Sequence, residues 1–540
     1  MQTLPPPEPR SEPQPAAAAQ IQSAWSPLNI PVFRLLWGTW LTANICMWMN
    51  DVAAAWMMTS LTSSPIWVAL VQTASTLPVF LLGLPSGAMA DILDRRRYFI
   101  ITQFWLASTA LILCLAVLSE VITPPLLLAL TFVNGIGLAM RWPVFAALVP
   151  EIVPRFHLPT ALALNGVSMN ASRIVGPLAA GALIASAGTA YVFVLNAVLS
   201  VISGLVVMRW RREYSPSPLG RERLFSAMRV GRQFVAQSTR LRAVFLRVAL
   251  FFFNSTALLA LLPLLARRLE GGGAGTFTLL LASMGCGAIA LAVVLPRLRQ
   301  ALAGNQLVLA GTLLQSAATL MMAFAPNVYV AVATMFLAGM AWLCTANTLS
   351  VSAQMALPDW VRARGMSMYQ MAIMGGSALG AALWGQVATM SSLTLSLSAS
   401  AVTGSLGMWA ALRLIHDHGL EEDLTPSREF KAPVGQTPPH SGPVVVTLEY
   451  RIDPARAAAF VKLMQESRRS RLRQGALSWE LLHDISEPDR YLERIVDESW
   501  TEHLRRFDRI TAADVALRDR KLAFHTASEP PLVTRYSVTS

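Results

Sequence analysis

The chain has 540 residues, of which 54% are hydrophobic and 14% are charged, whereas an ordinary soluble domain carries about 25% charged residues. This composition excludes an ordinary soluble protein and indicates a membrane protein. The net charge is +12, but the basic residues stand between apolar runs and do not alternate with aromatic residues on a polar segment, so no nucleic-acid partner is expected. The four cysteines lie singly in apolar runs without metal-binding spacing, and we expect neither a metal site nor a cofactor.

Residues 1–30 are rich in proline and predict a disordered N-terminal tail. After them, twelve apolar runs reach the length of about 20 residues that a helix needs to cross a bilayer. They lie at residues 34–58, 65–89, 98–119, 124–149, 159–186, 189–209, 243–267, 274–296, 305–325, 328–352, 361–387 and 390–414. We therefore predict an all-α polytopic membrane protein with twelve transmembrane helices, in two six-helix bundles over residues 31–210 and 243–415.

Basic residues gather on one side of the predicted membrane. The segment 211–242 between the bundles is rich in arginine, and alternate loops carry arginine while the loops between them mostly do not; Arg267 and Arg268 are the exception. Basic loops mark the cytoplasmic side. The pattern predicts a multi-pass protein of the cytoplasmic (inner) membrane, in contact with membrane lipid, with 211–242 as a cytoplasmic linker and both termini in the cytoplasm.

Charged residues inside the predicted spans indicate function, because burying a charge costs several kcal/mol unless it is paired or hydrated. Asp51 and Arg173 lie at similar depths, and we predict that they pair across the first bundle. Arg141 lies nearer mid-membrane, free to meet an anionic substrate. Our hypothesis is that Asp51 titrates and exchanges its arginine partner as protons and substrate alternate. A fixed, purely structural ion pair is the alternative.

Polar and aromatic residues of the same spans predict the rest of a substrate chamber. The polar set consists of Asn50, Asn165 and Asn170 beside the charges, and Asn254, Asn347, Tyr369 and Gln370 as orienting groups. The aromatic set consists of Trp48, Trp56, Phe132, Phe252, Trp342, Tyr369 and Trp384. Each aromatic residue taken singly is also explained by ordinary packing or by a place at the membrane interface.

The stretch SGAMADILDRRRY, residues 86–98, concentrates charge between two apolar runs. Its pattern resembles the loop signature of the major facilitator superfamily, which implies two six-helix bundles and a loop between the second and third helices. The matching positions are Gly87, Asp91, Asp94, Arg95 and Arg96, although Ile92 and Asp94 stand where arginine and glycine are usual. We expect Gly87 to let two helices approach, Asp91 to face the start of the eleventh span, and the arginines to contact anionic headgroups.

Two longer stretches, Phe33 to Asp91 and Ala161 to Leu183, resemble a narrower branch of that superfamily, the enterobactin-exporter-like transmembrane secretion effectors. Gly176, Pro177 and Gly181 also resemble part of the fifth-helix signature of proton-coupled antiporters. The resemblance implies a secondary active transporter that exports a small siderophore- or drug-like compound by proton antiport. Its implied partners are that small-molecule substrate and protons.

A soluble domain is predicted at residues 442–540, after a proline-rich linker at 416–441. The order strand, helix, strand, strand, helix, strand predicts an α+β ferredoxin-like fold. The domain resembles antibiotic-biosynthesis monooxygenases, and Trp479, Tyr491, Trp500, His503 and His525 are available there, but no motif assigns a catalytic residue. We expect a regulatory or dimerising module in a protein that is not an enzyme. The alternatives are a transporter fused to an active enzyme domain and a lipid translocator.

Overall fold

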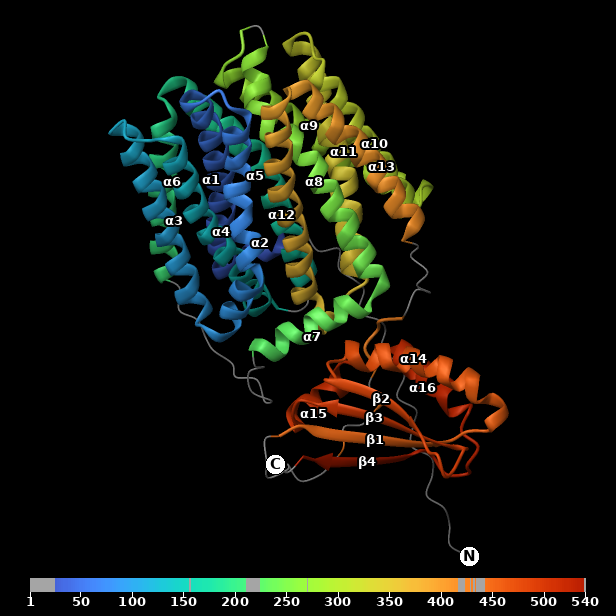
Figure 1. Cartoon of the computed structure of the whole chain (residues 1–540). Helices are drawn as coiled ribbons and strands as arrows, with labels where there is room; N and C mark the ends of the chain where they lie inside the picture. The colour runs from blue at the N-terminus through green and yellow to red at the C-terminus, as the bar shows by residue number, and fades with distance from the viewer. Residues whose placement is uncertain are drawn as a thin grey trace, which may run out of the picture.

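The computed structural model describes residues 25–154, 157–209, 224–269, 271–415, 423–427, 429–430, 433 and 442–538. Long helices form one part of the molecule, and a small sheet domain lies beyond one end of them (Figure 1). Residues 1–24 of the predicted N-terminal tail and most of the linker predicted at 416–441 lie outside the described residues. The linker predicted at 211–242 contains a helix, which the sequence analysis missed.

The first group of helices follows a short 3-10 turn, η1 (Ser26–Asn29). Its helices are α1 (Pro31–Leu61), α2 (Pro65–Ile92), α3 (Arg95–Leu118), α4 (Pro124–Ile152), α5 (Leu158–Ser186) and α6 (Thr189–Arg209). Four of them, α1, α2, α4 and α5, have proline in the first turn. Proline is tolerated there because the first backbone N–H groups of a helix have no partner within the helix. These prolines fix where the spans begin.

The second group comprises α8 (Thr239–Arg268), α9 (Ala274–Ala301), α10 (Gly304–Ala323), α11 (Val328–Met355), α12 (Asp359–Met390) and α13 (Leu393–Leu414). A shorter amphipathic helix, α7 (Leu224–Gln237), precedes them. Among the described residues, eleven helices are long and apolar enough to cross a membrane. The remaining predicted span is the first one in the chain, α1. It has 31 residues and so is long enough, but it is not among the eleven because of its composition.

The hydrophobic core is continuous at one end of the helices and divided at the other. We call the end beside α7 and the sheet domain the near end, and the opposite end the far end. At the far end, a single cluster of buried residues joins helices of both groups. At the near end, the cores are separate, with one built from α1, α3, α4, α5 and α6 and others built only from helices of the second group. The buried cores of the two groups are therefore shared at the far end and separate toward the near end, although α2 and α12 stay in contact at Gly83 and Met371.

The C-terminal domain is a four-stranded antiparallel sheet covered by helices. Its elements are β1 (Val444–Arg451), η3 (Pro454–Arg456), α14 (Ala457–Arg473), β2 (Ser478–His483), β3 (Arg490–Asp497), α15 (Trp500–Asp508), α16 (Ala512–Leu522) and β4 (Leu532–Ser537). The strand order is β2-β3-β1-β4. The second predicted helix is divided into α15 and α16. The predicted fold class, helical bundles with a small α+β domain, is confirmed.

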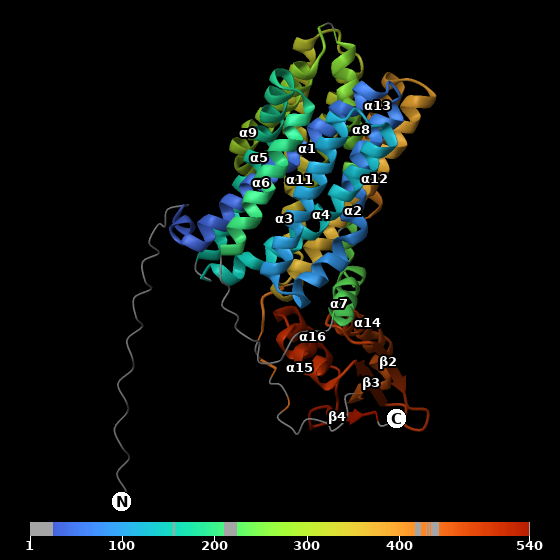
Figure 2. The same ribbon diagram turned by 90° about the vertical axis from the view of Figure 1, so that its left-hand side faces the viewer.

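Helix α7 lies between the long helices and the sheet domain in both views (Figures 1 and 2). Arg229 of α7 forms a 2.8 Å ion pair with Glu498 and donates to the Gly475 carbonyl oxygen at 3.1 Å. The guanidinium of Arg509 lies 5.2 Å from the ring centroid of Trp360, at the start of α12. The sheet domain thus contacts the second group of helices through α7 and α12.

Candidate functional site

A central cavity lies between the two groups of helices, where the shared far-end core gives way to separate near-end cores. Its empty volume is about 730 Å³. Its lining comes from α1, α2 and α5 of the first group and α8, α9 and α11 of the second, and includes Trp48, Asp51, Gln72, Arg173, Pro177, Phe277, Met284, Gly339 and Trp342. Asp51 and Arg173, predicted as a functional pair, therefore face one space.

Arg173 of α5 lies between two tryptophans. Its guanidinium carbon is 3.3 Å from the ring centroid of Trp342 on α11 and 5.5 Å from that of Trp48 on α1. Within the described residues, no carboxylate forms an ion pair with Arg173, so its contacts are aromatic. Cation–π contacts hold a guanidinium through the ring faces, and they leave its N–H groups available to a ligand in the cavity.

Asp51 of α1 faces the same cavity and accepts a 3.3 Å hydrogen bond at Oδ1 from the Ser75 hydroxyl on α2. The predicted ion pair with Arg173 is not formed among the residues that the structure describes. The two side chains share the cavity, but Arg173 is engaged by rings instead. The cavity therefore presents one acid and one base that contact different partners.

The structure places Arg141 differently from the sequence expectation. Its side chain is only 2% exposed and lies inside the first group, where it donates to the Ala43 carbonyl oxygen at 3.1 Å and lies 5.5 Å from the Trp40 ring centroid. It does not line the central cavity. In this conformation Arg173, and not Arg141, is the arginine that a substrate in the cavity would meet.

The fifth-helix motif brings helices close together. A Cβ added to Gly176 would lie 2.5 Å from Trp48 Cβ on α1, and one added to Gly181 would lie 1.7 Å from Thr278 Oγ1 on α9. Both glycines are thus required for close approach, one within the first group and one between the groups at the far end. Pro177, between them, lines the central cavity.

The other predicted polar residues are dispersed. Asn50 is fully buried and accepts from Asn196 of α6 at 3.4 Å. Asn254 is bonded to Thr403 and the Leu250 carbonyl, and the Tyr369 hydroxyl donates to the Ala346 carbonyl at 3.4 Å. Asn165 and Gln370 do not line the cavity. The side chain of Asn170 lies outside what the structure describes.

Asn347 and some of the predicted aromatic residues line the cavity or a groove beside it, and other aromatic residues pack elsewhere among the helices. The Asn347 amide oxygen accepts from Arg299 in a groove that adjoins the cavity. Of the predicted aromatic walls, Trp48 and Trp342 line the cavity, whereas Trp384 donates to the Phe253 carbonyl at 3.1 Å. Phe277, a cavity residue that sequence reasoning missed, lies 5.9 Å from the Trp56 ring. Nothing in its sequence context distinguishes Phe277 from other apolar positions.

The structure describes part of the loop motif. Asp94 is the N-cap of α3, because its Oδ1 accepts from the backbone N–H of Arg97 at 3.0 Å. Asp immediately before a helical run is a known capping signal, so this role was readable from the sequence. Arg96 donates to the Met208 carbonyl of α6. The side chain of Asp91, and with it the contact predicted at the start of α12, lies outside what the structure describes.

Gly87 is less constrained than expected. A Cβ there would meet Pro143 only at 3.9 Å, an ordinary van der Waals distance. Close approach near this point depends instead on Gly83, whose added Cβ would lie 3.0 Å from Met371 Cγ on α12.

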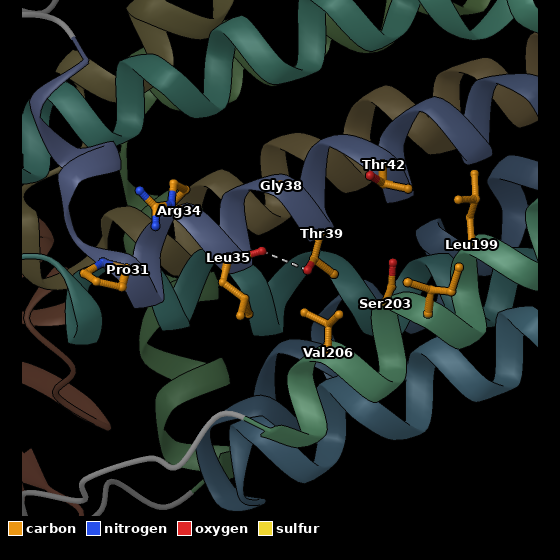
Figure 3. Close-up of a pocket in the computed structure, with 10 residues that line it drawn as sticks. Pro31, Arg34, Leu35, Gly38, Thr39, Thr42, Leu199, Ser203 and Val206 are labelled. Carbon is orange, nitrogen blue, oxygen red and sulfur yellow. Dashed lines mark hydrogen bonds between the residues drawn. The ribbon is translucent and has the colours of Figure 1, made fainter.

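A separate hollow lies between α1 and α6 on the outside of the first group (Figure 3). Arg34 and Pro31 lie at one end of it, and the Thr39 hydroxyl donates to the Leu35 carbonyl at 2.9 Å. Arg34 is 17 positions from Asp51, about 25 Å along α1 at roughly 1.5 Å per residue. None of the predicted site residues lines this hollow, and we do not assign the functional site to it.

The C-terminal domain has buried charges that contact one another. Glu493 on β3 is fully buried. Its carboxylate accepts from Ser467, Trp479 and Tyr450 and pairs with Lys521 and Arg471. Burial by itself would raise the pKa of Glu493, but the charges of Lys521 and Arg471 hold that pKa well below its usual value. Burial lowers the pKa of Lys521 to about 8, against the opposing effect of Glu493.

A second buried cluster surrounds Asp497. Arg506 binds both carboxylate oxygens, at 2.8 and 2.7 Å, and His503 Nδ1 lies 2.7 Å from Oδ2. Arg535 donates to His503 Nε2 at 3.2 Å, which makes Nδ1 the protonated nitrogen. Burial opposes ionisation of Asp497, but Arg506 and His503 lower its pKa overall. Of the predicted candidates, Trp479 and His503 are thus engaged in these two internal networks.

These features define the class of protein. Two groups of long apolar helices enclose a mostly apolar cavity that contains Asp51 and Arg173. The transmembrane secretion effector family matches residues 22–539, so the chain belongs to that family.

Individual relatives are distant. The Staphyloferrin A transporter of Staphylococcus aureus (strain NCTC 8325 / PS 47) is 22% identical over 251 residues, 46% of this chain and 63% of that protein. The uncharacterized MFS-type transporter YfiS of Bacillus subtilis (strain 168) is 29% identical over 161 residues, 30% of this chain and 37% of that protein. The chain thus spans less than two thirds of either curated relative.

Solved structures agree on the fold. The nucleoside transporter NupG matches with a TM-score of 0.57 at 12% identity, over 72% of this chain and all of that chain. A bacterial homolog of the human lysosomal transporter Spinster, in an inward-facing and occupied conformation, matches with a TM-score of 0.58 at 15% identity, over 72% of this chain and 97% of that chain. At these identities the likeness establishes the fold and no substrate.

Proposed function

We propose that this transporter exports a small anionic, siderophore- or drug-like compound from the cytoplasm by proton antiport. We also propose that it spans the inner membrane with both termini in the cytoplasm. The observation that carries the proposal is Arg173, placed between Trp48 and Trp342 in the cavity between the two helix groups. The name of the Staphyloferrin A transporter supports the siderophore class.

Arg173 carries a charge inside the membrane part and needs a counter-charge. An arginine within the membrane costs several kcal/mol unless it is paired or hydrated. Arg173 contacts rings and no carboxylate among the described residues, so a substrate carboxylate is the natural counter-charge. Arginine binds carboxylates with two parallel N–H donors. The rings on either side favour a flat or apolar substrate body next to that group.

Asp51 is the residue that supports proton antiport. Its carboxylate faces the same cavity and has the Ser75 hydroxyl as a partner. When ionised, a carboxylate accepts hydrogen bonds at both oxygens, and protonation removes part of that capacity. A substrate with O–H or N–H donors would therefore compete with a proton for Asp51, while its anionic group binds Arg173. Competition for one carboxylate couples proton and substrate in opposite directions.

The conformation supports the same cycle. The groups share a core at the far end and have separate cores toward the near end, and with the near end in the cytoplasm this supports an inward-facing state. Gly181 against Thr278 closes the far end between α5 and α9. Export then requires the far end to open as the near end closes, by rocking of one group against the other.

For the C-terminal domain we propose a regulatory or dimerising role. The polar groups between its sheet and helices are bonded to one another around Glu493 and Asp497, which favours a structural interior over a catalytic cleft. Its contacts with α7 and Trp360 place it where movement of the second helix group would reach it.

Transport in inverted membrane vesicles tests the proposal, with staphyloferrin A as the first probe. Wild-type vesicles should accumulate it when a pH gradient, acid inside, is imposed. Asp51→Asn should keep gradient-independent exchange and lose the response to the gradient, because an amide does not titrate. Glu120→Gln, a neutralised carboxylate in an exposed turn, is the matched control. An unchanged gradient response in Asp51→Asn would remove Asp51 from coupling.

A further inference from the structure

A groove continues from the central cavity toward the near end, between α5 and α9. Its empty volume is about 990 Å³, and it shares Arg173, Gly285 and Ala288 with the cavity. It begins where the two helices touch, since a Cβ on Gly285 would lie 2.6 Å from Ile174 of α5. A molecule in this groove therefore reaches Arg173 without passing through the far end.

One face of α9 forms the long wall of the groove. Gly285, Ile289, Ala292, Pro296 and Arg299 line it at spacings of four, three, four and three residues, which places them in one row along a helix. The row runs for about 21 Å at roughly 1.5 Å per residue. To one side of this row, Leu291 and Leu295 of α9 pack in a buried cluster with Leu307, and Leu295 also lines the groove. Ile289, Ala292, Pro296 and Arg299 are exposed, so most of the row lies outside that cluster.

The wall is apolar and open at membrane depth. Ile289 is 52% exposed and Val293 is 74% exposed, although both line the groove that also contains Arg173. Val293 lies eight positions before the end of α9, Ala301, about 12 Å along the helix axis on the same rise per residue. The groove is therefore open along the side of α9 and not only at the end of the helix.

Arginines stand at both ends of this apolar wall. Arg173 lies at the inner end, and Arg299 lies near the end of α9, where Asn347 of α11 accepts a hydrogen bond from its guanidinium. No carboxylate is among the described residues that line the groove. Two cations separated by exposed aliphatic side chains are complementary to a molecule with an anionic head and an apolar body.

We propose that the α5–α9 groove admits an amphiphilic anion from the membrane leaflet at the near end, with Arg299 as the first contact for its anionic head and Arg173 as the second. The inference rests on the proposed role of Arg173 and adds the route and the substrate class: an anion with an apolar tail that partitions into the bilayer. Ile289, Ala292 and Val293 would contact that tail while the head moves inward.

Photolabelling tests the groove apart from transport. The purified full chain, in phosphatidylcholine vesicles, is irradiated with dodecyl sulfonate that carries a diazirine in its chain, and the labelled residues are mapped by mass spectrometry. Comparison with the matching dodecyl alcohol shows the effect of the charge on labelling. Labelling by an ethyl sulfonate diazirine, which has no long apolar chain, shows how far the groove is reached from water. We expect the dodecyl sulfonate to label α9 between residues 285 and 299 about tenfold more than the alcohol, the ratio for one charge-assisted contact of roughly 1.4 kcal/mol.

Two variants sharpen the result. Arg299→Gln should reduce labelling by the dodecyl sulfonate to the level of the alcohol, whereas Arg297→Gln, on the same helix but outside the groove lining, should leave it unchanged. Equal labelling by sulfonate and alcohol, no effect of Arg299→Gln, or stronger labelling by the ethyl sulfonate would each overturn the leaflet route. Photolabelling does not measure transport. The labelling result can therefore be interpreted even if antiport fails in vesicles, and the antiport result can be interpreted even if labelling fails.

Discussion

Buried charged residues have different partners in the membrane helices and in the C-terminal domain. Asp51 and Arg173 face a shared cavity and contact a hydroxyl and two aromatic rings. Glu493, in contrast, is surrounded by Lys521, Arg471 and three neutral donors. A buried ion pair whose hydrogen bonds are all satisfied holds one arrangement. A buried charge with a neutral partner on one side and a cavity on the other is placed to exchange partners, and this difference separates the proposed transport site from the interior of the C-terminal domain.

The largest expected effect is at Arg173. Arg173→Gln removes the proposed counter-charge of the substrate, and we expect the rate of vesicle uptake to fall by about 100-fold, as for loss of a charge-assisted pair of roughly 3 kcal/mol. Arg173→Lys keeps the charge without the planar fork and should retain part of the rate. Uptake of the same probe at equal protein amounts is the measurement. Equal rates in wild type and Arg173→Gln would break the comparison, since Arg173 would then be structural.

Glu493→Gln should destabilise the C-terminal domain and leave the cavity unaltered. Removing one partner of a buried ion pair costs about 3–5 kcal/mol, because Lys521 and Arg471 would remain charged without it. Hydrogen exchange of β1 and β3 in the full chain measures the loss. Glu480→Gln is the control on the neighbouring strand, because its pair with Arg494 is exposed and should contribute less than about 1 kcal/mol. Similar effects of the two substitutions would contradict the distinction.

The same domain should lose stability in acid. Its carboxylates Glu493 and Asp497 have folded-state pKa values below their ordinary values of 4.5 and 3.8. A lowered carboxylate pKa gives stability that is complete above the unfolded-state pKa and is lost as the pH falls through the folded-state pKa. Hydrogen exchange of β3, corrected for the intrinsic rate and followed from about pH 6 to about pH 3, should therefore report falling protection below roughly pH 4.5. Constant protection over that range would indicate that these carboxylates are not stabilising.

The smallest effect is expected where the two regions meet. The Arg229–Glu498 pair is partly exposed, at 21% and 32% of the two side chains, and such pairs contribute less than about 1 kcal/mol. Arg229→Ala should raise hydrogen exchange in α7 by no more than about fivefold. Arg520→Ala, which removes an exposed pair with Glu466 inside the domain, should leave α7 unchanged. A much larger rise with Arg229→Ala would mean that one contact holds the two regions together.

Particular helices and residues show which features could be predicted from the sequence. The spans were predictable because about 20 apolar residues are needed to cross a bilayer, and α2, predicted at 65–89, is observed at Pro65–Ile92. Helix α7 was missed because its arginines were taken as part of a linker, although its apolar residues follow a helical period. Arg141 and Arg173 could be placed in depth by the rise per residue, but the direction in which each side chain points around its helix depends on packing.

The sequence by itself determined the long apolar helices, the small α+β domain and the presence of a few charges within spans, because length, hydropathy and alternation are local properties of the chain. Tertiary structure alone decided that Arg173 meets Trp342 from the other helix group, that Arg141 is buried against Ala43, and that Arg299 shares a groove with Arg173. These contacts join residues far apart in the chain. They are set by helix rotation, by tilt and by glycine-mediated close approach such as that at Gly181, which a one-dimensional pattern does not contain.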